Sequence, residues 1–111
     1  MDFEKTAREK HRSGMICSGA VYQTFLKVNP SASGAPVPRS EGGKCGAVLS
    51  AEKILRETGA GSIEEFDAQF RSLFGSLKCS DLLGKSRGSC NDYVGKAAEI
   101  VGMILLDNGK I

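Results

Sequence analysis

Apolar residues recur every three or four positions through most of this chain, and this spacing is the feature that most limits its fold. Side chains at that spacing lie on one face of an α-helix, so each such stretch predicts a helix with one face turned to a core. No stretch shows the sustained two-residue alternation with β-branched residues that is typical of strands. The sequence therefore predicts an all-α fold, an irregular bundle of four to six short helices. The predicted helices cover about residues 2–13, 16–28, 45–57, 63–75 and 90–107, with a short turn at 79–83.

Residues that begin and end helices divide the chain further. Asn29 is followed by proline, which pushes the preceding residue out of the helical region and ends the second predicted helix. The segment 29–43 contains all three prolines and predicts one long loop. Ser62 and Glu65 have the spacing of a capping box, which predicts the start of the fourth helix. With 111 residues, the chain is expected to form a single helical domain, 1–111.

Charge and composition argue against several classes of function. The chain has 15 Lys and Arg residues against 13 Asp and Glu, and this net charge of +2 is too weak and dispersed to predict nucleic-acid binding. No apolar stretch approaches the roughly 18 residues of a membrane span. The first residues alternate in charge and lack the apolar region of a signal peptide, so a cytoplasmic location is expected. A solvated basic face is predicted for Lys5, Arg8, Lys10 and Arg12.

Cysteines are the residues with the clearest chemical potential, and the chain has four: Cys17, Cys45, Cys79 and Cys90. Their gaps do not form the Cys-x-x-Cys pairs of zinc fingers, zinc ribbons or thioredoxin-type motifs. Each cysteine, however, lies in or beside the first turn of a predicted helix or turn. Unpaired N–H groups and the helix dipole favour anions there, so a thiol at that place is expected to have a lowered pKa. In a reducing compartment, such thiols predict metal ligands or redox groups before structural disulfides.

The residues around these cysteines carry a resemblance to a known family. Gly14 to Val21 is similar to its Gly-aromatic-Asn-Cys-x-x-Ala-Val motif, with Met15 and Ile16 in place of the aromatic residue and the asparagine. Gly42 to Val48 holds its Cys-Gly-Ala core, with Ser50 where the pattern has its last glycine. Phe70 to Gly84 is similar to its Phe-Gly-x-x-x-Cys-x-x-Leu-Leu-Gly segment, and Cys90 to Ile100 to its closing helix. Over residues 10–106 the chain thus resembles the redox-active proteins named for the C_GCAxxG_C_C pattern. The resemblance implies a redox partner protein, associated with an oxidoreductase or a transporter.

Several functions stay open from the sequence. The leading prediction is that Cys17, Cys45, Cys79 and Cys90 bind one iron–sulfur cluster for electron transfer, because such centres take four cysteine ligands. Gly42, Gly43 and Gly46 lie around Cys45 in the sequence. Without side chains, they would let the backbone approach the cluster closely. The alternative is that they only form a turn and the start of a helix.

The first alternative is metal-free thiol–disulfide chemistry with the pairs Cys79/Cys90 and Cys17/Cys45. A structural zinc site and a helical interaction module are further alternatives. The sequence decides neither whether the protein is an enzyme nor whether it forms a homodimer.

Other candidate residues have a simpler structural explanation. His11 shares an apolar stripe with the first predicted helix, which predicts a packed or half-exposed position rather than a ligand. Gly95 and Gly102 lie seven positions apart on one face of the last predicted helix, and they predict close packing against a neighbouring helix; room for a cofactor or a subunit is the alternative. Core positions are predicted for Phe66, Phe70 and Phe74.

Overall fold

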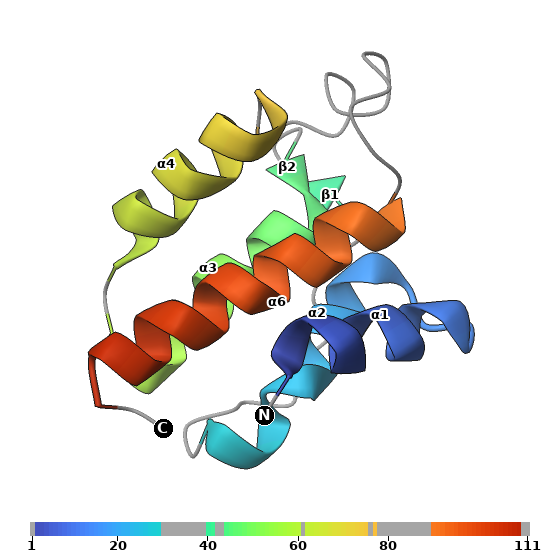
Figure 1. Cartoon of the computed structure of the whole chain (residues 1–111), viewed down its shortest axis with the longest axis horizontal. Coiled ribbons are helices and arrows are strands. Elements are labelled where there is room, and N and C mark those ends of the chain that lie inside the picture. The colour runs from blue at the N-terminus through green and yellow to red at the C-terminus, as the bar shows by residue number, and fades with distance from the viewer. Residues whose placement is uncertain are drawn as a thin grey trace.

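The computed structural model of the chain describes residues 2–29, 40–41, 44–60, 62–75, 77 and 90–109. Within these residues the helices are α1 (Phe3–Arg12), α2 (Cys17–Thr24), α3 (Gly46–Thr58), α4 (Ile63–Phe74) and α6 (Cys90–Asp107). One turn of 3-10 helix, η1 (Leu26–Val28), follows α2. The predicted all-α fold is confirmed (Figure 1). The second predicted helix is divided, because Phe25 leaves the helical conformation between α2 and η1.

A pair of two-residue strands corrects the loop that the sequence predicts over residues 29–43. Strand β1 (Ser40–Glu41) pairs antiparallel with β2 (Lys44–Cys45), and Ser40 lies opposite Cys45. The loop predicted over 29–43 therefore includes a strand, whereas residues 30–39, 42 and 43 lie outside the described part. Strands of two residues are too short to show a periodic pattern, so the sequence carries no signal for them. Cys45 ends β2 and is the N-cap residue of α3 rather than part of that helix.

Helix α6 lies at the centre of the bundle, and α1, α2, α3 and α4 each pack against it (Figure 1). The core role predicted for three phenylalanines is confirmed, because Phe66 and Phe70 are fully buried and Phe74 is 8% exposed. Their rings form a chain from α4 to α6. Ring centroids are 5.8 Å apart for Phe66 and Phe70 and 4.9 Å apart for Phe74 and Tyr93.

Two helices end at a glycine, and one predicted cap is not formed. Gly59 and Gly75 have φ angles of 77° and 85°, and they end α3 and α4 in the left-handed conformation that favours glycine. Ser62 precedes α4, but its hydroxyl donates to the carbonyl oxygen of Ala60 at 3.3 Å. The capping box predicted with Glu65 is therefore wrong. Ser62 has a ψ of 43° instead of the extended conformation of most N-cap residues, and its side chain makes no bond to the first turn.

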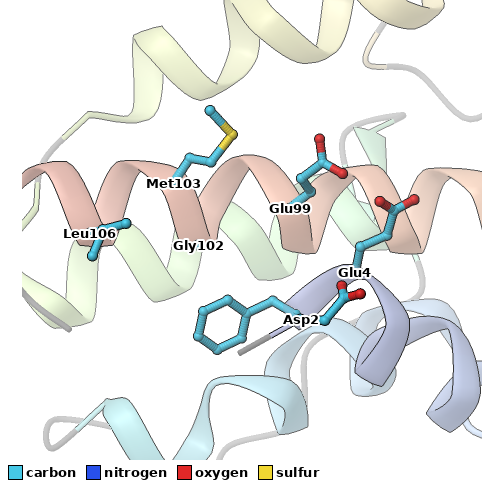
Figure 2. Close-up of a pocket in the computed structure, with 7 residues that line it drawn as sticks. Asp2, Glu4, Glu99, Gly102, Met103 and Leu106 are labelled. Atoms are coloured by element: carbon cyan, nitrogen blue, oxygen red, sulfur yellow. The ribbon is translucent and has the colours of Figure 1, made fainter.

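Close packing between α1 and α6 explains two glycines of α6. A Cβ atom at Gly95 would overlap the Arg8 side chain, and one at Gly102 would lie 2.5 Å from Cδ2 of Phe3. Gly102 lies where α6 faces the start of α1 (Figure 2). The Phe3 ring also stacks on Phe25, with the centroids 4.5 Å apart. The prediction of close helix packing is confirmed.

We expect Gly102→Ala to lower the free energy of unfolding by about 1–3 kcal/mol, the usual effect of overpacking a core. The new methyl group must displace the Phe3 ring, which Phe25 holds in place. Gly19→Ala in α2 is the matched control, because its Cβ would lie 3.6 Å from the nearest atom, Cγ1 of Ile16. That change should stabilise the protein by up to about 1 kcal/mol, since alanine favours helix. Urea denaturation followed by circular dichroism measures both effects; a Gly102→Ala protein as stable as the unaltered chain would contradict this account.

Candidate functional site

Two of the predicted thiols, Cys17 and Cys45, lie together where α2 and α3 begin. Cys17 is the first residue of α2 and is half-buried, whereas Cys45 is the N-cap residue of α3 and is 4% exposed. Both are in the thiol form, and a hydrogen bond joins them. The contact arises because α2 and α3 pack side by side. One pair of the predicted four thiols is therefore brought together.

The neighbouring thiol and burial control the protonation of Cys45. The hydrogen bond with Cys17 raises the pKa of Cys45 most, and burial raises it further. The backbone N–H groups of Ala47 and Val48, in the first turn of α3, act in the opposite direction. The pKa stays well above its ordinary value, so Cys45 keeps its proton and donates to Cys17. For Cys45, the expectation of easy ionisation at a helix start is wrong, because burial and a second thiol outweigh the helix N-terminus.

A buried hydrogen bond ties the two helix starts together. The Ser50 hydroxyl donates to the carbonyl oxygen of Ser18 at 2.6 Å, and both residues are fully buried. Ser18 follows Cys17 in the first turn of α2, and Ser50 lies in α3 beyond Cys45. Ser50 is the residue that stands in place of a glycine in the resembled pattern, and a glycine there could not make this bond.

We expect Ser50→Ala to lower the free energy of unfolding by about 1 kcal/mol, because it removes a buried hydrogen bond between two helices. Ser72→Ala, at an exposed position of α4, is the control and should change stability by less than about 0.5 kcal/mol. Chemical denaturation of the two variants compares them directly. Equal effects would show that the bond from Ser50 to Ser18 does not stabilise this site.

The other predicted site residues are described in part. Cys79, Gly42 and Gly43 lie outside the described residues, as does the turn predicted at 79–83. Cys90 is the first residue of α6 and is described in its backbone, and Gly46 is the buried first residue of α3. The predicted Cys79/Cys90 pair therefore stays a prediction. Within the described ranges, no group of three or more His, Cys, Asp or Glu side chains is placed to hold a metal ion.

A backbone hydrogen bond joins Leu77 to Cys45 in the candidate site. The N–H group of Cys45 donates to the carbonyl oxygen of Leu77 at 3.0 Å. Leu77 is a described residue that stands two positions before Cys79 in the sequence. The backbone of Leu77 is thus anchored at the start of α3.

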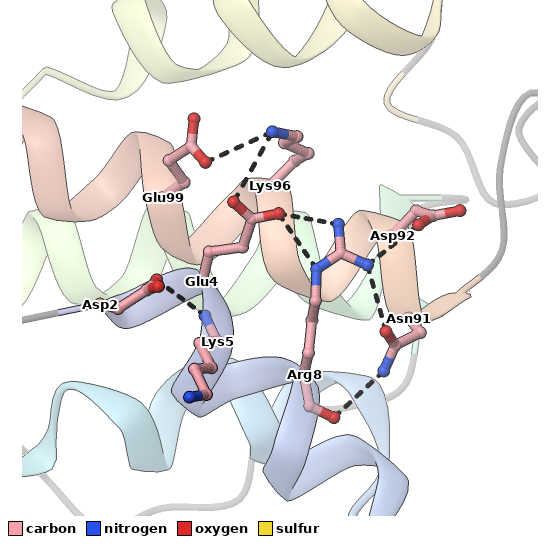
Figure 3. Close-up of polar contacts among 8 residues, drawn as sticks. All are labelled: Asp2, Glu4, Lys5, Arg8, Asn91, Asp92, Lys96 and Glu99. Carbon is pink, nitrogen blue, oxygen red and sulfur yellow. Dashed lines mark hydrogen bonds and ion pairs between the residues drawn. The ribbon is translucent and has the colours of Figure 1, made fainter.

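A second contact lies next to Cys90. The Asn91 side chain donates to the carbonyl oxygen of Arg8 at 3.1 Å (Figure 3). Its amide nitrogen also lies 3.2 Å from Nδ1 of His11. This ties the start of α6 to the last turns of α1, from which the chain continues to Cys17. His11 is half-buried, as predicted.

Arg8 strengthens the same contact between α1 and α6. Its guanidinium donates to Glu4 and Asp92, each at 2.9 Å, and to Asn91 at 3.1 Å (Figure 3). The side chain is 19% exposed. Arg8 therefore does not belong to the solvated basic face predicted for α1, because its charge is turned toward carboxylates of α1 and α6.

Comparison of the chain with protein-family models, with curated proteins and with solved structures found no match. Among the helices of the described residues, none is long and apolar enough to cross a bilayer.

Proposed function

We propose that this protein is a small redox-active protein and that Cys17 and Cys45 form the centre of its site. The observation that supports this most directly is the contact between the two thiols, one half-buried and one buried. Two thiols in contact can be oxidised to a disulfide, with loss of two protons and two electrons, or they can bind one metal centre together. The proposed partner of this protein is a redox protein that is an oxidoreductase or is associated with a transporter.

In the metal-free form, Cys17 meets the partner because it is the more exposed thiol and lies at the N-terminus of α2. Its thiolate attacks one sulfur of a partner disulfide, a mixed disulfide forms, and the other partner sulfur leaves as a thiolate. In the mixed disulfide, Cys17 is no longer a thiol beside Cys45, so Cys45 gives up its proton to the released partner thiolate as it attacks the sulfur of Cys17, and the second partner thiolate leaves. The dithiol is oxidised by two electrons, the partner disulfide is reduced, and the two protons pass to the partner's thiolates.

The second form of the proposal is the predicted iron–sulfur cluster. Cys17 and Cys45 supply two of four sulfur ligands, and the N–H groups of Ala47 and Val48 donate to the Cys45 sulfur. Such bonds stabilise negative charge on a ligand sulfur. Cys79 and Cys90, the other two cysteines of the sequence, are the proposed remaining ligands. A cluster bound there supplies one-electron transfer; a structural zinc would use the same donors.

Purification without oxygen, followed by analysis of iron, zinc and acid-labile sulfide, distinguishes these forms. Iron with matching sulfide and a visible chromophore supports the cluster, and zinc alone indicates a structural site. For protein without metal, the thiols are titrated against redox potential. A two-electron transition that disappears in both Cys17→Ser and Cys45→Ser supports the dithiol form. Absence of metal together with absence of that transition would overturn the proposed function.

A further inference from the structure

A cavity of about 590 Å³ lies between the start of α1 and the last turns of α6 (Figure 2). Its apolar wall consists of Phe3, Met103 and Leu106, together with the bare backbone at Gly102. Met103 and Leu106 are 54% and 65% exposed, although both are large apolar side chains. The volume falls in the range of about 300–1,000 Å³ that is typical of sites for small organic molecules.

Of the described residues that line this cavity, the charged ones are all acidic: Asp2, Glu4 and Glu99. The cation beside them is Lys96, whose Nζ lies 3.3 Å from Glu99 and 3.7 Å from Glu4 (Figure 3). Arg8 also pairs with Glu4, but it is shared with Asp92. Among the described residues, Asp2, Glu4, Glu99 and Asp92 thus outnumber the two cations that pair with these carboxylates, Arg8 and Lys96.

The pKa values of Glu4 and Glu99 are shifted in opposite directions. The hydrogen bond between their carboxyl groups lowers the pKa of Glu4 and raises that of Glu99. This bond and burial raise the pKa of Glu99, although Lys96 acts in the opposite direction. An additional cation at this position would allow both groups to ionise.

We propose that the cavity binds a small organic cation, an ammonium group carried on an alkyl body. The ammonium group lies against the carboxylates of Glu4 and Glu99, and the apolar body covers Met103 and Leu106. Both parts of the ligand are needed, because the acidic rim and the apolar wall adjoin each other across one cavity (Figure 2). Neither Cys17 nor Cys45 lines this cavity, and the proposal does not depend on the redox function.

The test is an NMR titration of the full chain with hexylammonium, with 1-hexanol and hexanoate as probes of the same length but different charge. At constant ionic strength, we expect hexylammonium to bind at least about tenfold more tightly than either analogue, as a charge-assisted contact requires. The shifted signals should come from the first turn of α1 and the end of α6.

Glu99→Gln should weaken hexylammonium binding about tenfold, because it removes one carboxylate and keeps the shape of the side chain. Glu64→Gln, at an exposed position of α4, is the control and should leave binding unchanged. Circular dichroism verifies that both variants are folded. Equal binding of the three probes, equal effects of the two variants, or no shift up to the solubility limit would each overturn the proposal.

Discussion

Phe70→Ala should be the most damaging truncation in the core, lowering the free energy of unfolding by about 3–5 kcal/mol. Phe70 is fully buried, and its ring centroid lies 5.8 Å from that of Phe66, 4.9 Å from Phe74 and 6.3 Å from Tyr93. Truncation removes these ring contacts and leaves a cavity between α4 and α6. A domain of this size is stable by only about 5–15 kcal/mol in total, so this one change removes a large part of its stability.

Leu73→Ala is the matched control for this prediction. Leu73 lies on the same helix, three residues after Phe70, but it is 52% exposed. Its truncation should lower the free energy of unfolding by less than about 1 kcal/mol. Urea denaturation of both variants tests the difference, and a Phe70→Ala chain that fails to fold would be the upper limit of the expected result. Similar values for the two variants would contradict the burial described for α4.

The helices could be predicted because their signal is local. In α4, for example, Phe66, Phe70 and Phe74 repeat at four-residue intervals, and Gly75 supplies the left-handed residue that ends the helix. The β1–β2 pair and the hydrogen bond of Ser62 could not be predicted in the same way, although the start of α4 at Ile63 was predicted. A two-residue strand has no periodicity, and the hydroxyl of Ser62 had a choice of backbone partners that the sequence does not rank.

The contacts of the candidate site could be predicted less well than the helices, because they depend on how the helices pack together. The placement of Cys17 at a helix start followed from local pattern, but its contact with Cys45 depends on how α2 packs against α3. In the sequence, Ser50 stood out only because the resembled pattern has a glycine at that position. Its hydrogen-bond partner, the carbonyl oxygen of Ser18, belongs to another helix, α2. Arg8 likewise resembled a surface residue of α1, because the carboxylate of Asp92 that it contacts lies far along the chain.

Unequal reactivity of the two contacting thiols is the second large effect that we expect. In reduced, metal-free protein at neutral pH, Cys17 should react with iodoacetamide on the order of a hundredfold faster than Cys45, because only the accessible thiolate reacts. Cys45 is 4% exposed, and its raised pKa keeps it protonated at that pH, whereas Cys17 is half-buried. Peptide mapping by mass spectrometry after timed quenching measures each cysteine separately. The same reaction in denaturant is the control, and there the two rates should become similar.

Substitution of Cys45 tests whether the hydrogen bond, and not exposure alone, sets the reactivity of Cys17. A hydrogen bond donated to a thiolate favours its charged form, so Cys45→Ala, which removes the S–H group beside Cys17, should slow the alkylation of Cys17. Cys45→Ser keeps a donor at the same position and should restore much of the rate. If Cys17 reacts equally fast in both variants, the bond contributes nothing to its reactivity. If Cys45 reacts as fast as Cys17 in the folded protein, the division into an accessible attacking thiol and a buried resolving thiol is wrong.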